Sequence, residues 1–74
     1  MANFPSLTPE KLIKILEKKG FKFIRAKGSH QIFRNFETKK MTVVPMHKKD
    51  LPKGTLEVIL KQCGIKRSEI LDLI

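Results

Sequence analysis

The hydrophobic pattern of this chain changes period twice, which divides it into a helical part, an extended part and a second helical part. The first part has a helix start at Thr8-Pro9-Glu10. Threonine caps a helix, proline is favoured at its first position, and a carboxylate suits its positive end. Apolar residues then fall on one face and lysines on the other, until Gly20 is placed to end the helix in a left-handed conformation.

From Phe21 onward the apolar period is two, which is the pattern of β-strands. In the first strand Arg25 shares its phase with two phenylalanines, whereas Lys22 and Ile24 take the other phase. Pro45 is expected to end the last strand, because proline has no N–H to donate. The turn and the two later strands that the pattern predicts are Ala26–Ser29, Gln31–Phe36 and Met41–Val44.

A second amphipathic helix follows, because apolar residues recur at the spacing i, i+3, i+4 and i+7. These residues are Leu56, Ile59, Leu60 and Cys63. Gly64 is placed to end this helix, and Ser68-Glu69 begins a short C-terminal helical turn.

Together the elements predict an α+β fold of the α-β-β-β-α type, in one domain that spans residues 1–74. Short connections imply that the three-stranded sheet is antiparallel. Both main helices have a single apolar face, so we expect them to pack on one face of the sheet and to leave the other free. Ile32 and Phe33 are adjacent and both apolar, so the pattern leaves open which face carries His30.

The charge of the chain favours a polyanionic partner. Sixteen Lys and Arg residues against seven Asp and Glu residues give a net charge of +9, which makes RNA or DNA the expected partner. The alternative is a lysine-rich surface without a binding role. The basic residues are spread along the chain and no apolar run approaches the ~20 residues of a membrane helix, so no membrane association is expected.

Cofactor and metal sites are not expected. Cys63 is the single cysteine, which excludes an intrachain disulfide and favours a reducing, cytoplasmic location. The two histidines and this cysteine lack the spacing of a metal site, and no glycine-rich nucleotide motif is present. Cys63 lies on the apolar face of its helix and is expected to be a core residue.

The best candidate for chemistry is the tetrad Lys27-Gly28-Ser29-His30. A Gly-Ser turn presents backbone N–H groups to an anion, and the His30 side chain reaches the same place. Arg25 and Arg34 are close in sequence, and cationic neighbours favour a neutral imidazole that accepts a proton. We therefore interpret His30 as a candidate general base; the alternative is a surface histidine at the start of a strand.

A second basic segment, His47-Lys48-Lys49, lies in the loop after the third strand. Two histidines can serve as base and acid in RNA cleavage, and the lysines can contact phosphates. Nothing in the sequence fixes the distance between His47 and His30, so we interpret His47 as a solvated loop histidine, with a catalytic role as the alternative.

Several short motifs resemble, in order and spacing, those of the HicA toxins, the small ribonucleases of bacterial and archaeal toxin–antitoxin pairs. The matching pieces are Lys19-Gly20-Phe21, Lys27-Gly28-Ser29-His30 with Phe33, Val44-Pro45-Met46-His47, Leu51–Leu56 and Ile59–Ile65. The resemblance implies a fold like that of double-stranded-RNA-binding domains, metal-independent cleavage of mRNA, and a HicB-type antitoxin partner.

The resemblance also places His30 at the family's catalytic histidine. Gln31 departs from the pattern, because many relatives carry a second histidine there. Two further interpretations stay open: a non-catalytic RNA-binding module of the same fold, and a copy that serves only as partner of an antitoxin.

Overall fold

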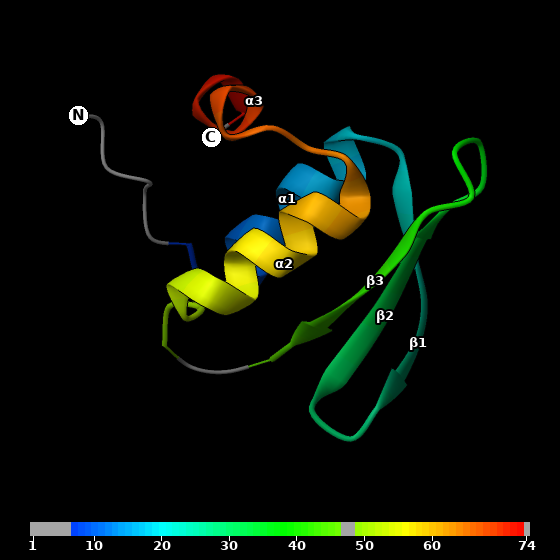
Figure 1. Ribbon diagram of the computed structural model, residues 1–74. Helices are drawn as coiled ribbons and strands as arrows, with labels where there is room; N and C mark the ends of the chain where they lie inside the picture. The colour runs from blue at the N-terminus through cyan, green and yellow to red at the C-terminus, as the bar shows by residue number, and fades with distance from the viewer. Residues whose placement is uncertain (1–6, 47–48, 74) are drawn as a thin grey trace.

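The computed structural model describes residues 7–46 and 49–73, the last three by their backbone alone. Three antiparallel strands form one sheet in the order β1-β2-β3, and the helices lie on one side of it (Figure 1). The elements in chain order are α1 (Pro9–Lys18), β1 (Phe21–Lys27), β2 (His30–Asn35), β3 (Met41–Pro45), α2 (Lys53–Cys63) and α3 (Arg67–Leu73). The expected α+β arrangement is confirmed, including the C-terminal helix.

Both ends of α1 follow from local sequence. The Thr8 hydroxyl accepts a hydrogen bond from the backbone N–H of Lys11 at 3.3 Å, which satisfies one of the free donors at the helix start. Leu7 and Leu12, on either side of this cap, are both buried. Gly20 has φ +92°, and a Cβ there would lie 3.2 Å from the amide nitrogen of Asn35. Gly20 therefore provides both the left-handed turn and the close approach of α1 to β2.

The C-terminal end of α2 is built in a similar way. Gly64 has φ +71°, and a Cβ there would collide with the ammonium group of Lys40. Lys40 thus sits over the negative end of α2, where a cation is favourable. After this end, Glu69 accepts a hydrogen bond from the backbone N–H of Lys66 at 2.8 Å and pairs with Lys19 at 3.1 Å, which joins α3 to the end of α1.

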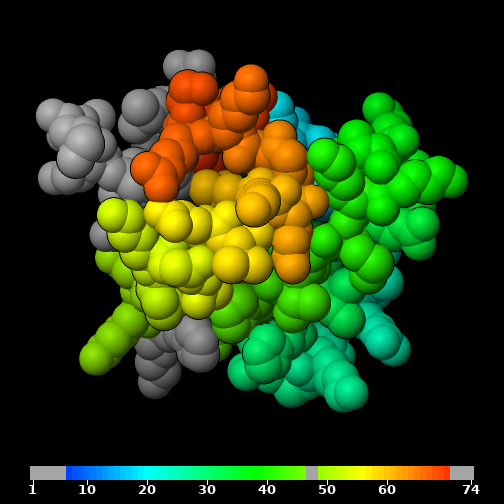
Figure 2. Space-filling model, in the orientation of Figure 1, coloured from blue at the N-terminus to red at the C-terminus, as the bar shows by residue number. Residues whose placement is uncertain are grey.

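The core lies between the helices and one face of the sheet. Phe33 of β2 and Val44 of β3 are both fully buried there. The core residues contributed by the helices and their flanks include Leu12, Ile15, Leu16, Leu56, Ile59, Leu60, Cys63 and Ile70. No helix among the described residues covers the opposite face of the sheet, and the β1–β2 turn lies away from the helices (Figure 1). The β2–β3 connection contacts the end of α2, where Lys40 reaches Gly64 (Figure 2).

The strand ends differ from those expected. β1 continues through Ala26 to Lys27, β2 begins at His30, and Phe36 lies in the following turn instead of in the strand. Pro45 belongs to β3, where it pairs with His30. The N–H of Met46 donates to the Ser29 carbonyl and therefore points toward β2. Backbone N–H groups of successive strand residues point to opposite sides, so the nitrogen of Pro45, which has no hydrogen to donate, faces the free edge of the sheet. Proline is tolerated at that position of an edge strand.

Candidate nucleic-acid interface

A two-residue turn carries the predicted tetrad at the tip of the β1–β2 hairpin. Lys27 and His30 form the last cross-strand pair, with Gly28 and Ser29 between them. Gly28 has φ +60°, as the first central residue of a type II′ turn requires, and a Cβ there would contact nothing within 4 Å. Glycine is therefore needed for its conformation alone. The Ser29 carbonyl accepts a hydrogen bond from Met46 at 2.6 Å, which ties the tip to the end of β3.

The alternation of β2 settles which face carries His30. Phe33 and Asn35 are buried beneath the helices, whereas His30 is exposed. Successive side chains of a strand point to opposite faces, so Ile32 and Arg34 share the face of His30, away from the helices. The imidazole of His30 accordingly lies open to a ligand on the free face of the sheet.

A β-bulge at Ile24 brings two predicted cations onto the same face. Phe23 pairs with Phe33 of the helix-covered face, but the register then shifts and Arg25 pairs with Ile32. The bulge reverses the alternation, because two residues of β1, Ile24 and Arg25, follow Phe23 where β2 has the single residue Ile32. Our expectation that Arg25 shares the face of Phe21 is therefore wrong.

Beyond the bulge, Lys27 pairs with His30. At the other end of β1, Lys22 pairs with Arg34 and reaches the same face without a register shift. Directly opposed side chains in an antiparallel pair have Cβ atoms about 4.5–5.5 Å apart. Each outward side chain of β2 therefore has a cation beside it from β1.

The third strand gives this face an apolar border. Met41, Val43 and Pro45 pair with Arg34, Ile32 and His30 in turn. Met41 and Val43 are 51% and 42% exposed, so their side chains are largely open to solvent. We call this surface the outer sheet face; it consists of Lys22, Ile24, Arg25 and Lys27 of β1, His30, Ile32 and Arg34 of β2, and Met41, Val43 and Pro45 of β3.

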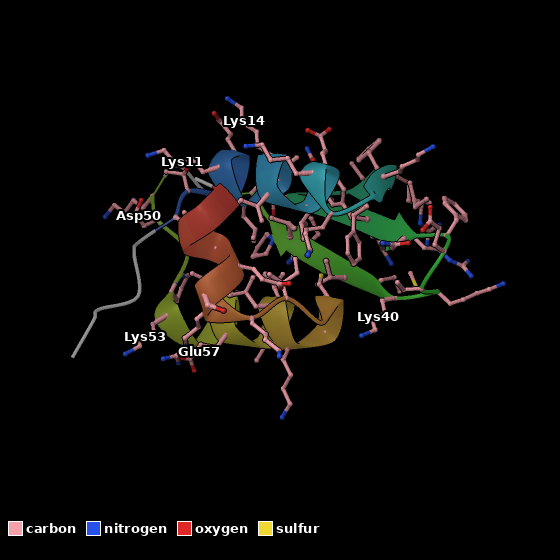
Figure 3. The ribbon with its side chains drawn as sticks, turned by 90° about the horizontal axis from the view of Figure 1, so that it is seen from above. Lys11, Lys14, Lys40, Asp50, Lys53 and Glu57 are labelled. Atoms are coloured by element: carbon pink, nitrogen blue, oxygen red, sulfur yellow. The ribbon has the colours of Figure 1, made fainter. Side chains whose placement is uncertain are left out.

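The outer sheet face differs electrostatically from the helical layer. None of its residues is acidic, and its cations lie on β1 and β2. On the helical side, lysines and carboxylates are interspersed: Lys11 and Lys14 project from α1, Lys53 and Glu57 project from α2, and Asp50 lies on the side of Lys11 in this view (Figure 3). Positive potential without intervening carboxylates is therefore concentrated on the outer sheet face, which is what a phosphate backbone requires.

The structure brings together four of the predicted site residues on the outer sheet face, namely Arg25, Lys27, His30 and Arg34. Gly28 and Ser29 form the adjoining turn. Lys49 is exposed but lies two residues before Leu51, whose N–H donates to the carbonyl of Leu7, beside the start of α1. His47 and Lys48 lie outside the described residues.

Lys22 and the apolar residues of β3 were not predicted as site residues. Simple alternation from Phe21 identifies Lys22 as outward-facing, so a signal for it was present. The position of Arg25 had no such signal, because the bulge contains no glycine that marks it.

Cys63 is buried as expected. Burial raises the pKa of its thiol to about 11, against a smaller opposing effect of a hydrogen bond with Thr42. A neutral, enclosed thiol is a poor nucleophile. No three His, Cys, Asp or Glu side chains gather into a metal-binding group among the described residues.

None of the helices in the described ranges has the length and hydrophobicity that crossing a bilayer requires. No curated protein matches the sequence. The family described as the HicA toxin of bacterial toxin–antitoxin systems matches residues 9–65, a range that runs from the start of α1 past the end of α2 and includes the whole sheet. With 74 residues in the chain, this match covers more than half of it. The chain therefore belongs to the HicA family of toxins.

Proposed function

We propose that this toxin is a metal-independent endoribonuclease that cleaves mRNA on its outer sheet face, with His30 as general base. One observation carries the proposal: the register of the sheet places the exposed His30 directly opposite Lys27, with Arg25 next along β1. A proton acceptor thus stands beside cations on an open surface long enough for a polymer. An unprotonated imidazole nitrogen can accept a proton from a hydroxyl group, which suits this role.

The proposed reaction uses the 2′-hydroxyl of the substrate. His30 takes the proton of this hydroxyl while its oxygen forms a bond to the adjacent phosphorus, and the bond from phosphorus to the 5′-oxygen breaks. The leaving 5′-oxygen gains a proton from solvent, so one proton is taken and one is returned. The products are a 2′,3′-cyclic phosphate and a 5′-hydroxyl, and DNA is spared because it has no 2′-hydroxyl.

The cations beside His30 supply the second part of catalysis. Negative charge grows on the phosphate oxygens during the attack, and the ammonium group of Lys27 lies on the same face to stabilise it. Arg25 and Lys22 continue the basic row of β1 and hold the flanking phosphates. Positive side chains of the protein therefore take the place that a metal ion has in other nucleases.

The proposal extends to the whole chain and to its partner. Residues 1–74 act as a single RNA-binding and ribonuclease domain, and the mRNA substrate implies a cytoplasmic location. A HicB-type antitoxin inhibits the toxin by covering the outer sheet face. An acidic surface on that protein would complement the cations around His30.

The test is His30→Ala, measured with purified protein and single-stranded RNA in the presence of a chelator. We expect the cleavage rate to fall about 10²- to 10⁴-fold, which is the usual contribution of a general base. The thermal midpoint should change little, because His30 is exposed. Gln31→Ala is the matched control: it alters the next residue, whose side chain points to the other face.

Three results would contradict all or part of the proposal. Equal cleavage by His30→Ala and the parent, with the fold unchanged, would remove His30 from the reaction. If neither protein cleaved any RNA while both bound it, the chain would be a non-catalytic RNA-binding module on the same surface. Cleavage that stops when the chelator is added would refute metal independence alone.

A further inference from the structure

We propose that Phe36 and Arg34 form a stacking site for a single RNA base at the end of the outer sheet face opposite to His30. The inference rests on the proposed function in one respect, namely that RNA lies along this face. It adds a second contact point, which fixes how the RNA strand is placed relative to His30.

Phe36 differs in position from the phenylalanines of the strands. Phe21 and Phe33 are 3% and 1% exposed and belong to the core. Phe23 is 53% exposed, but it pairs with Phe33 on the helix-covered face and contacts that ring edge-on with ring centroids 5.8 Å apart. Phe36 is 56% exposed in the turn after β2. Most of its ring is therefore available to a ligand, and its burial contributes little to the core.

The guanidinium group of Arg34 holds this ring in place. Its central carbon lies over the Phe36 ring, 5.3 Å from the ring centroid. Such a cation–π contact orients the aromatic ring and leaves part of it open. Nucleic-acid bases stack on aromatic rings and on guanidinium planes, and the pair presents both kinds of surface together.

Arg34 also has an unused hydrogen-bond donor. Its Nε is buried and, within residues 7–46 and 49–73, has no hydrogen-bond partner. A buried donor without a partner is unfavourable by about 1–3 kcal/mol. A nucleotide stacked on Phe36 that draws the guanidinium group outward would expose this donor to a phosphate or base oxygen. The same residue therefore supplies a contact for the base plane and one for the polar edge of the nucleotide.

The distance along β2 gives the position of this nucleotide. Arg34 lies four positions after His30 in β2, which corresponds to about 13 Å at the rise of a β-strand. A stacked strand advances about 3.4 Å per nucleotide, so the platform lies roughly four nucleotides from the cleaved bond. Occupation of both points would allow only one register of the RNA.

The experiment measures binding of a single-stranded RNA decamer to the His30→Ala protein by fluorescence anisotropy. A set of decamers carries one abasic nucleotide at each position in turn. With Phe36 present, we expect loss of one particular base to weaken binding about 5- to 100-fold, the usual contribution of one base stacked on an aromatic residue. With Phe36→Ala added, that position should become no more sensitive than its neighbours.

Three further variants separate stacking from other contacts. Phe36→Trp should keep the position-specific loss, whereas Phe36→Leu should abolish it although the side chain stays apolar. Val58→Ala is the control, because Val58 is 55% exposed on α2, away from the sheet. It should change nothing.

The proposal is wrong if Phe36→Ala leaves the position-specific loss intact, if Phe36→Leu binds as Phe36 does, or if the substitution weakens only the binding of an antitoxin protein. A parent protein that binds no decamer would overturn it as well. Failure of the catalytic assignment is distinguishable, because it would show as undiminished cleavage by His30→Ala while the abasic scan still marked one position.

Discussion

The two faces of the sheet are built from alternate residues of the same strands, but they differ in how their polar groups are satisfied. On the helix-covered face, the buried amide of Asn35 donates to the carbonyl of Lys19 at 3.0 Å, and its oxygen accepts from the N–H groups of Glu37 and Thr38. On the outer sheet face, the buried Nε of Arg34 has no partner among the described residues. The buried Asn35 side chain beneath the helices is thus internally paired, whereas the outer face contains a buried donor that no protein group satisfies among the described residues.

The contrast separates stability from function within a small domain. A chain of this length buries only about 60% of the surface that its unfolded form exposes, so the core has little stability to spare. Residues that stabilise the fold and residues that contact a ligand alternate along β2, and substitutions can test each set by itself. The comparison therefore predicts different outcomes for neighbouring residues.

The largest expected effect is on the helix-covered face. Phe33→Ala should lower the free energy of unfolding by about 3–5 kcal/mol, because Phe33 is 1% exposed and its removal leaves a cavity. Ile32→Ala, one residue earlier on the outer sheet face, should lower it by less than half as much, because Ile32 is only partly buried. Urea unfolding of the two variants measures the difference. Equal losses would mean that the outer sheet face is also part of the core.

The sequence predicted the order and type of the elements because each has a strong local signal. Thr8 and Gly20 delimit α1, and Gly64 ends α2, where the observed backbone has the conformations that these residues favour. The sequence also placed a turn at the hairpin tip, Ala26–Ser29, although Ala26 and Lys27 belong to β1 and the observed turn is Gly28-Ser29 alone.

The faces of β1 and the role of Asn35 were beyond a local prediction. The bulge at Ile24 is set by the pairing of β1 with β2, so only the register reveals that Arg25 lies beside Ile32. Asn35 lies in a segment with ordinary strand alternation, and its bond to Lys19 joins residues 16 positions apart. Both features depend on the assembled sheet.

A smaller effect on the free energy of unfolding is expected when the pH is raised, because Cys63 lies buried between α2 and the helix-covered face. The pKa of the Cys63 thiol is raised to about 11 by burial, above the ordinary value of 9.0 that applies when the chain is unfolded. Between these values the unfolded chain loses a proton that the folded protein retains, so stability falls as the pH rises. A difference of about two pH units corresponds to a loss of roughly 2–3 kcal/mol.

Many lysines titrate in the same range, so the measurement is a comparison with Cys63→Ala. Unfolding free energies of both proteins from pH 8 to pH 11 should diverge, with the parent losing more stability than the variant. Parallel curves would show that the thiol is accessible to water and that α2 does not seal this part of the core. RNA cleavage at pH 8 should be equally fast in both proteins, because Cys63 belongs to α2, on the other side of the sheet from the outer sheet face.

The smallest expected effect is on RNA affinity, and it tests whether the bulge at Ile24 is what places Arg25 on the outer sheet face. Deletion of Ile24 removes the extra residue of the bulge and leaves Arg25 opposite Ile32, so the basic row of β1 is unchanged. Deletion of Ala26 also regularises the strand, but it moves Arg25 opposite Gln31 and therefore onto the helix-covered face. Ala26 is exposed, so the arginine placed near that position stays solvated and the fold should survive.

The two deletions thus differ by one phosphate contact. For single-stranded RNA, the slope of log affinity against log salt should become less steep by about 0.7 for the Ala26 deletion, and stay at the parent value for the Ile24 deletion. Anisotropy titrations between 50 and about 300 mM salt would measure both slopes. If the slopes were equal, Arg25 would not contact phosphate, and the bulge would serve only to fit β1 to its partner strand. If the Ile24 deletion alone lost the contact, the bulge would be holding Arg25 in place by its local twist, since such irregularities re-aim neighbouring side chains.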